Sequence, residues 1–99
     1  MRYEIVWLPQ AEIRFEEITD YLRNKWSQKE VDNFIARVNE VIDIISETPD
    51  LYKYSIKQKI YEAVVTSHNI LLYRIKGNKV ELMTFFDTRQ DPNKKYTEE

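Results

Sequence analysis

Three β-rich runs decide the fold of this chain: VVTSH at residues 64–68, LLYRI at residues 71–75 and FFDTRQDP at residues 85–92. Each begins with aliphatic or aromatic residues, and short polar stretches separate them, which is the pattern of neighbouring strands. Gly77, the single glycine of the chain, precedes Asn78 between the second and third runs. This pair suits a tight hairpin turn that needs a positive φ angle. The last third of the chain therefore predicts strands at about Lys59–Thr66, Ile70–Ile75 and Val80–Phe86.

Two amphipathic helical patterns precede these strands. Pro9 suits the first turn of a helix, because its missing N–H group would be unpaired there. The apolar stripe of this first helix recurs at helical spacing, and it consists of Ala11, Phe15, Ile18, Leu22 and Trp26.

The second helix has a start signal and a stop signal. Ser27 and Glu30 fit the S-x-x-E capping box, with Trp26 and Val31 at the hydrophobic staple positions around it. Thr48-Pro49 ends the helix. The stripe between these signals is wide and has Ile42 near its middle; it consists of Val31, Phe34, Ile35, Val38, Val41, Ile42 and Ile45.

The order of elements predicts an α+β fold. A short strand around Arg2–Trp7 precedes the helices, and a loop containing Leu51, Tyr52 and Tyr54 follows them. The resulting order is β-α-α-β-β-β, with a two-helix antiparallel hairpin packed on one face of a small, mainly antiparallel sheet. We expect a single domain over residues 1–99, in which residues 93–99 form a flexible polar tail.

Composition excludes several classes of protein. The 99 residues include no cysteine and one histidine, so neither a disulfide framework nor a Cys/His metal site is expected, and no cofactor is implied. No apolar run reaches the ~18–20 residues of a membrane span, and the start of the chain lacks the pattern of a signal peptide. We therefore expect a cytoplasmic protein.

Charge is unevenly distributed along the chain. The formal net charge is −2, yet residues 27–50 carry two basic and six acidic side chains, a net −4. Residues 53–79 carry six basic side chains and one acidic one, a net +5. An acidic helix is therefore expected beside a basic sheet. This asymmetry either indicates charged binding partners or reflects an incidental bias of two solvated faces.

Side chains of the run at residues 70–75 must alternate between the two faces of the sheet. We assign Leu71, Tyr73 and Ile75 to the face that packs on the helices. Ile70, Leu72 and Arg74 then lie on an open face, as an exposed apolar strip beside a cation that another chain could cover. The alternative is that the loop at residues 50–57 shields this face.

These patterns in this order resemble the RelE/ParE family of bacterial toxins. The resemblance covers nearly the whole chain, from Ile5-Val6-Trp7 through the two helices to Leu72-Tyr73-Arg74-Ile75 and the closing residues 87–92 (DTRQDP). It implies a growth-inhibiting toxin of a type II toxin–antitoxin pair of the kind involved in plasmid stabilisation, neutralised by a cognate antitoxin. RelE-like members cleave messenger RNA on the ribosome, and ParE-like members inhibit DNA gyrase. The shared fold does not choose between these targets.

Candidate site residues follow from the chemistry of metal-independent RNA cleavage. That reaction needs a base for the 2′-OH proton, cations beside the phosphorus centre and an acid for the leaving oxygen. The candidates for catalysis are Arg89, Arg74 and His68, with Tyr96 as a further proton-transfer group. The candidates for binding the target or nucleic acid are Lys57, Lys59, Arg74 and Arg89. The candidates for binding the antitoxin are Ile70, Leu72 and Arg74.

Two departures from the family weaken the nuclease hypothesis. RelE-like nucleases carry an arginine where this chain has Ile70, and many relatives carry one in the preceding strand, where this chain has Tyr61 and Glu62. Losing cations from a contact face lowers affinity for polyanionic RNA. An mRNA endoribonuclease and a gyrase inhibitor therefore both stay open. The alternative from a different class is a non-enzymatic module that binds a partner peptide in an apolar groove, and DNA binding by the chain itself is disfavoured by its acidic helix.

Overall fold

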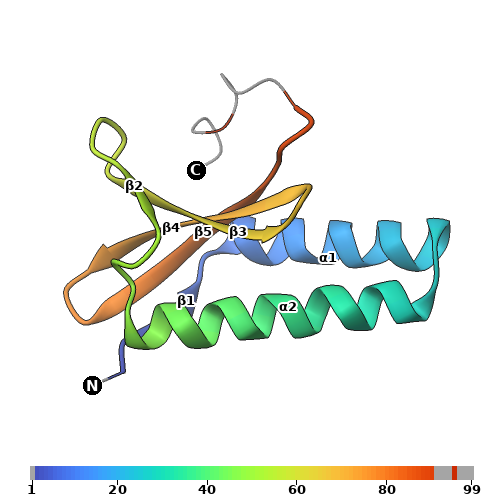
Figure 1. Ribbon diagram of the computed structural model, residues 1–99, viewed down its shortest axis with the longest axis horizontal. Coiled ribbons are helices and arrows are strands. Elements are labelled where there is room, and N and C mark those ends of the chain that lie inside the picture. The colour runs from blue at the N-terminus through green and yellow to red at the C-terminus, as the bar shows by residue number, and fades with distance from the viewer. Residues whose placement is uncertain (1, 91–94, 96–99) are drawn as a thin grey trace.

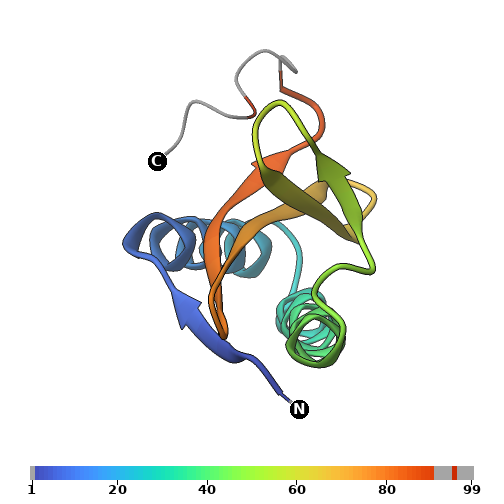
Figure 2. The same ribbon diagram turned by 90° about the vertical axis from the view of Figure 1, so that its left-hand side faces the viewer.

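The computed structural model describes residues 2–90 and residue 95. Its elements run in the order β1 (Glu4–Trp7), α1 (Pro9–Lys25), α2 (Gln28–Glu47), β2 (Lys53–Ser55), β3 (Ile60–Thr66), β4 (Asn69–Lys76) and β5 (Lys79–Asp87). The two helices pack side by side on one face of the sheet (Figures 1 and 2). The predicted α+β architecture is confirmed, with β2 as an additional strand inside the predicted loop.

The five strands form one sheet in the order β1-β5-β4-β3-β2. β1 pairs with β5 in parallel, and the other neighbours pair antiparallel. Gly77 has a φ angle of 63° in the turn between β4 and β5, as the sequence predicted. β3, β4 and β5 are consecutive antiparallel neighbours, so the end of β3, the start of β4 and the end of β5 lie at the same side of the sheet.

Local signals define the ends of both helices. α1 begins with Pro9 in its first turn. The Ser27 hydroxyl accepts a hydrogen bond from the Glu30 N–H group at 3.4 Å, which confirms the predicted cap of α2. At the other end, the Thr48 N–H group donates to the Ile44 carbonyl at 2.9 Å, and the helix stops before Pro49.

The main core lies between the helices and the sheet. The assignment of Leu71, Tyr73 and Ile75 to this face is confirmed, because the first two are buried in the core and Ile75 packs against it. In α2 the deepest positions include Val41 and Ile45, whereas Ile42 is only partly buried. The stripe of α2 is thus centred one residue away from Ile42.

The opposite face of the sheet is not open as predicted. Leu72 is only 2% exposed and belongs to a second apolar cluster with Ile60, Met83 and Phe86, against which Ile70 packs. One cause is a register shift between β4 and β5. Leu72 pairs with Thr84 and Tyr73 pairs with Leu82. Met83, which lies between these two partners, therefore forms a bulge in β5 and adds its large side chain to this face.

Lys95 covers part of the same face. Its ammonium group lies 3.3 Å from the Glu62 carboxylate and 5.7 Å from the centre of the Phe86 ring. This residue is therefore packed, whereas the rest of the predicted flexible tail lies outside the described residues. None of the helices in the described part is long and apolar enough to cross a membrane.

Candidate functional site

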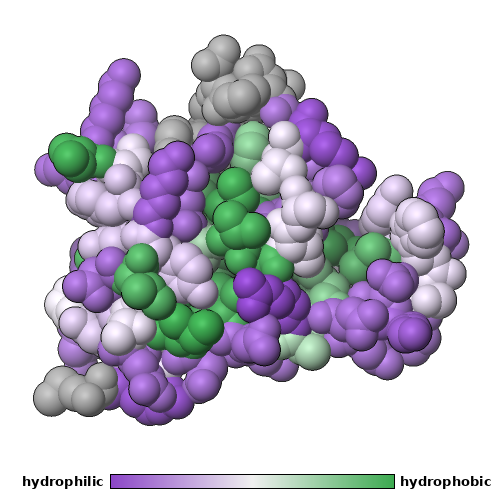
Figure 3. All heavy atoms as spheres, viewed as in Figure 1, coloured by the Kyte–Doolittle hydropathy of each residue, from purple (hydrophilic) through white to green (hydrophobic). Residues whose placement is uncertain are grey.

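A cavity lies between α1 and the ends of β4 and β5, and we call it the α1 groove. Its volume is about 540 Å³. In Figure 3, hydrophobic surface lies recessed between the sheet and the right-hand half of the helical layer. Thirteen side chains line the groove: Arg14, Glu17, Ile18, Tyr21, Leu22, Trp26, Glu30, His68, Asn69, Phe85, Asp87, Arg89 and Gln90.

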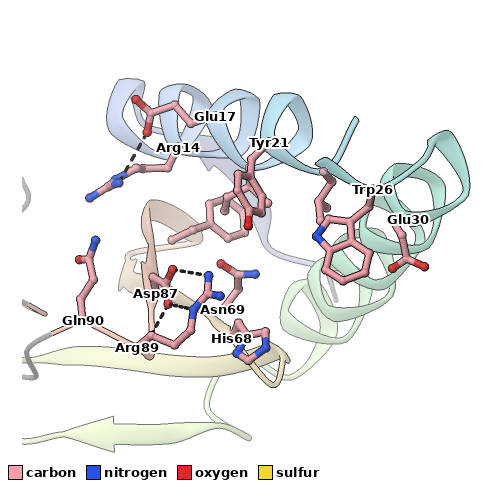
Figure 4. A pocket seen from close by; sticks show the side chains of 13 residues that line it. Arg14, Glu17, Tyr21, Trp26, Glu30, His68, Asn69, Asp87, Arg89 and Gln90 are labelled. Atoms are coloured by element: carbon pink, nitrogen blue, oxygen red, sulfur yellow. Dashed lines mark hydrogen bonds and ion pairs between the residues drawn. The ribbon is translucent and has the colours of Figure 1, made fainter. Parts of the chain in front are cut away.

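α1 supplies one wall of the groove. Arg14, Glu17 and Tyr21 recur at intervals of three and four residues, so they share a face beside the stripe that packs on the core. Arg14 and Glu17 form an ion pair at 3.5 Å. Tyr21 is half-exposed and points toward the opposite wall (Figure 4). The apolar floor comes from Ile18 and Leu22, which also pack against the core.

Trp26 closes the end of the groove nearest the helical turn. The residue caps the C-terminal end of α1 with a non-helical backbone conformation, and its backbone N–H group donates to the Leu22 carbonyl at 2.9 Å. Its side chain is 69% exposed, so the predicted place of Trp26 in the buried stripe is wrong. The backbone turns here to begin α2 at Ser27, which directs the indole away from the core and toward the side of the groove that carries Glu30 (Figure 4).

Asp87 and Arg89 form the opposite wall as a closed ion pair. Arg89 Nε donates to Asp87 Oδ1 at 3.0 Å and Nη2 donates to Oδ2 at 2.8 Å, while the Arg89 N–H group donates to Oδ1 at 2.8 Å. These hydrogen bonds hold the pKa of Asp87 below its ordinary value and raise that of Arg89. The guanidinium is thus fixed in place, and its charge is largely compensated.

The β3–β4 turn brings His68 to the same wall. The Thr88 N–H group donates to the His68 carbonyl, and the Thr88 hydroxyl donates to the Ser67 carbonyl, both at 3.0 Å. These bonds fasten the segment after β5 to the turn. Of the candidates from sequence, the structure therefore brings together Arg89 and His68 (Figure 4).

Arg74 lies elsewhere, on the opposite face of the sheet. Its Nε donates to Glu81 Oε1 at 2.6 Å, and this bond lowers the pKa of the Glu81 carboxyl group. A second cavity of about 290 Å³ lies beside it, lined by Leu8, Pro9, Gln10, Ile13, Arg74 and Met83. The structure thus separates the two candidate arginines into different cavities.

The remaining candidates do not line the α1 groove. Ile70 and Leu72 belong to the second apolar cluster, with Leu72 buried in it. Lys57 and Lys59 are exposed in the turn between β2 and β3. Tyr96 lies outside the described residues, and the described part of the chain holds no group of three or more side chains suited to a metal ion.

Sequence reasoning missed the aromatic side of the groove. Tyr21 belongs to a polar helix face whose partner wall is contributed by residues 68–90, which lie 47 to 69 positions later in the chain, and no local pattern shows that contact. For Trp26 a signal was present. A residue directly before an N-cap lies between two helices, where the backbone leaves the helical stripe.

A family model described as the ParE toxin of the type II toxin–antitoxin system parDE matches residues 5–92. No curated protein sequence matches the chain. Several solved toxin structures share its fold at low sequence identity. A chain of the chromosomal ParDE system from P. aeruginosa superposes with a TM-score of 0.73 at 10% identity, covering 87% of this chain and 96% of that one.

Two further structures extend this likeness. The YoeB/ParE toxin from Agrobacterium tumefaciens gives a TM-score of 0.62 at 13% identity, covering 85% of this chain and 96% of that one. A YoeB–YefM toxin–antitoxin complex from Staphylococcus aureus contains a chain with a TM-score of 0.58 at 15% identity, covering 91% of this chain and 100% of that one. These structures support the fold, and the family match spans most of the sequence. The chain therefore belongs to the ParE toxin family of type II toxin–antitoxin systems.

Proposed function

We propose that this protein is the toxin of a type II toxin–antitoxin pair, that it arrests growth by inhibiting DNA gyrase through protein–protein contact, and that a cognate antitoxin neutralises it. The observation that carries this proposal is the α1 groove, which combines an apolar floor with two exposed aromatic side chains and an arginine whose charge is compensated.

The residue types of the groove favour a protein as the target. Tyr21 and Trp26 are exposed beside the apolar Ile18 and Leu22. Tryptophan, tyrosine and arginine are enriched among the residues that dominate the binding energy of protein interfaces. Tyrosine and tryptophan bury a large area with few rotatable bonds. A groove with this lining suits the side chains of a partner protein.

The cations are poorly arranged for RNA cleavage. Arg74 and Arg89 lie in different cavities, and each donates hydrogen bonds to a carboxylate. A phosphate would have to compete with Glu81 and Asp87 for these guanidinium groups. Tyr61 and Glu62 lie where many relatives carry an arginine, and the buried Glu62 carboxylate pairs with Lys95 at 3.3 Å, so this part of the sheet offers no arginine to a phosphate.

A ribonuclease is the second candidate, and one observation favours it. His68 and Arg89 line the same cavity, so a proton-transfer group and a cation lie on one wall. RNA cleavage through this wall would require Arg89 to leave Asp87 and contact the phosphate.

The antitoxin follows from family membership. The family is defined by toxins of parDE pairs, and the structural neighbours include a YoeB–YefM complex. We expect the gene beside this one to encode a protein that covers the α1 groove and thereby blocks the surface that gyrase would contact.

The test is to induce the protein alone in a bacterial host and to measure DNA supercoiling and protein synthesis separately. We expect growth arrest, relaxation of a reporter plasmid before synthesis declines, and rescue by the adjacent reading frame. The double variant Tyr21→Ala/Trp26→Ala should lose toxicity, whereas Leu51→Ala, which removes an exposed apolar side chain outside the groove, should stay toxic. Loss of protein synthesis with unchanged supercoiling would favour the ribonuclease. Unchanged growth in the presence of folded protein would favour the alternative of a non-enzymatic module that binds a partner.

A further inference from the structure

The hairpin formed by β2 and β3 projects from the sheet beyond the helices (Figures 1 and 2). Its turn at residues 56–59 has a defined conformation. The Lys59 N–H group donates to the Ser55 carbonyl at 2.7 Å, and the Gln58 N–H group donates to the Ser55 hydroxyl at 3.3 Å. Lys59 has a φ angle of 58°, which a lysine adopts only at some energetic cost. The backbone of the turn therefore has a defined conformation from which its side chains project.

Three tyrosine rings form a ladder across the strands at the base of this hairpin. Tyr61 stacks on the core residue Tyr73, with ring centres 5.2 Å apart and planes 13° apart. Tyr54 continues the ladder, 4.5 Å from Tyr61. Tyr54 lies on the edge strand and is 44% exposed, so the ladder ends in an aromatic ring accessible to solvent.

The two inner rings of the ladder are uncharged at neutral pH. Burial and the neighbouring Tyr54 raise the pKa of Tyr61, and burial raises that of Tyr73. Buried Tyr73 is also fixed by the hydrogen bond from its hydroxyl to the Pro49 carbonyl at 2.5 Å. The inner rings thus provide a rigid support for Tyr54.

The hairpin turn beside the exposed ring is positively charged, because it carries Lys57 and Lys59 and no acidic residue. Lys53 at the base of the hairpin lies 4.0 Å from the Glu62 carboxylate, and Asp50 contributes to the raised pKa of Tyr61, so the positive charge is concentrated at the turn. The lysines of the turn are exposed, and Ile56 between the strands is 83% exposed, the highest value among the large hydrophobic residues in the described part of the chain. In Figure 3, hydrophobic surface stands alone among hydrophilic side chains in the region of this hairpin.

We infer that the β2–β3 hairpin is a binding site for an unpaired nucleotide segment of nucleic acid, in which a base stacks on Tyr54 and the phosphates on either side contact Lys57 and Lys59. Aromatic side chains beside cations are the general means by which proteins bind single strands without reading their sequence. Ile56 contacts the sugar or a neighbouring base. This site is separate from the α1 groove and does not depend on the proposed inhibition of gyrase.

An acidic protein segment would use only part of this surface. Carboxylates would satisfy the lysines, but they would leave the flat ring of Tyr54 and the apolar side chain of Ile56 exposed to water. A nucleotide brings a planar base and a phosphate within the same small unit, so it uses both features at once. The chemistry of the hairpin therefore favours nucleic acid over an acidic peptide.

The test is to titrate the purified protein with a short oligonucleotide that carries 2-aminopurine between thymidines, and to follow the quenching of its fluorescence on stacking. We expect saturable quenching, with an apparent association constant that falls with salt at a log–log slope of about −1.4, since each of two phosphate contacts on a single strand contributes about −0.7. A uridine oligomer with the same probe tests RNA, and a blunt duplex tests the need for an unpaired base.

Matched variants separate the roles of ring and charge. Tyr54→Ala should weaken binding about 5- to 150-fold, the range expected for loss of one base–aromatic stack, whereas Tyr54→Phe should keep the affinity. Lys57→Gln/Lys59→Gln should weaken binding and flatten the salt slope. Lys25→Gln/Lys29→Gln, which removes two exposed lysines of the helical layer, should bind as the unmodified protein does.

Three outcomes would overturn the inference. One is the absence of quenching with either single strand. Another is equal affinity of Tyr54→Ala and the unmodified protein at the same melting temperature. The third is competition by polyglutamate as strong as that by an unlabelled thymidine oligomer, because this would show a cationic patch with no preference for bases.

Discussion

At the scale of single residues, two arginines that look alike in the sequence have different surroundings. Arg89 lines the α1 groove and bonds to Asp87, and Arg74 lies on the opposite face of the sheet and bonds to Glu81. Both ion pairs are partly exposed to water, so each contributes little to stability. The two arginines differ in the surface on which a partner could contact them, because they lie in different cavities.

We therefore predict different effects for Arg89→Gln and Arg74→Gln. Both variants should melt within a few degrees of the unmodified protein, because exposed ion pairs add little to the free energy of unfolding. Only Arg89→Gln should weaken toxicity and antitoxin binding, as measured by growth after induction and by titration calorimetry. Equal loss of function in both variants would show that the face carrying Arg74 also contacts the target.

The Arg74–Glu81 pair gives a prediction for pH. Arg74 lowers the pKa of Glu81 below its ordinary value of 4.5, so the pair stabilises the folded state above that pH, and this contribution is lost as the pH falls through the folded-state pKa. Glu81→Gln should lower the melting temperature by at most a few degrees at pH 7, and this difference should disappear below the folded-state pKa of Glu81. Glu16→Gln, which removes an exposed carboxylate beyond the first turn of α1, serves as the control. A difference that persists unchanged at low pH would contradict the assignment.

At the scale of elements, α2 and the β4–β5 hairpin are the parts that the sequence defined best. The capping box, the wide stripe and Thr48-Pro49 placed α2, and Gly77 placed the hairpin turn. These signals are local, and local signals can be read from spacing alone. The short β2 had none, since its three residues join the sheet only by pairing with β3.

The depth of burial along α2 predicts a graded response to truncation. Ile45→Ala should lower the free energy of unfolding by about 2–5 kcal/mol, because the side chain is fully buried and its removal leaves a cavity. Ile42→Ala should cost clearly less, since Ile42 is only partly buried. Urea denaturation measures both, and equal losses would mean that the stripe is centred on Ile42 after all.

Gly77 predicts a purely conformational effect. A Cβ atom at this position would meet no heavy atom within 4 Å, yet the φ angle of 63° is unfavourable for any residue with a side chain. Gly77→Ala should therefore cost about 1–2 kcal/mol, and Gly77→Asn should cost less, because asparagine tolerates this region better. A neutral alanine variant in the same denaturation assay would show that the turn adopts another conformation.

At the scale of the whole molecule, the sequence predicted that two helices pack on one face of the sheet, but it did not predict the apolar cluster on the opposite face. Helix-side burial of Leu71 and Tyr73 followed from alternation along one strand. Burial of Leu72 did not, because it depends on a bulge in β5 and on a second apolar cluster drawn from β3, β4 and β5. The α1 groove was likewise hidden, since its two walls come from segments far apart in the sequence and the helical spacing of Trp26 wrongly predicted its burial.

The family assignment and the groove together lead to one central claim, which is that the protein inhibits DNA gyrase through the α1 groove. The most direct measurement is the ATP-dependent supercoiling of relaxed plasmid by purified gyrase in the presence of the purified protein. We predict inhibition by the unmodified protein and by Leu51→Ala, and inhibition at least about tenfold weaker for Tyr21→Ala/Trp26→Ala, as expected when hot-spot side chains are removed. Unimpaired supercoiling at saturating protein, together with cleavage of messenger RNA on ribosomes, would contradict the claim.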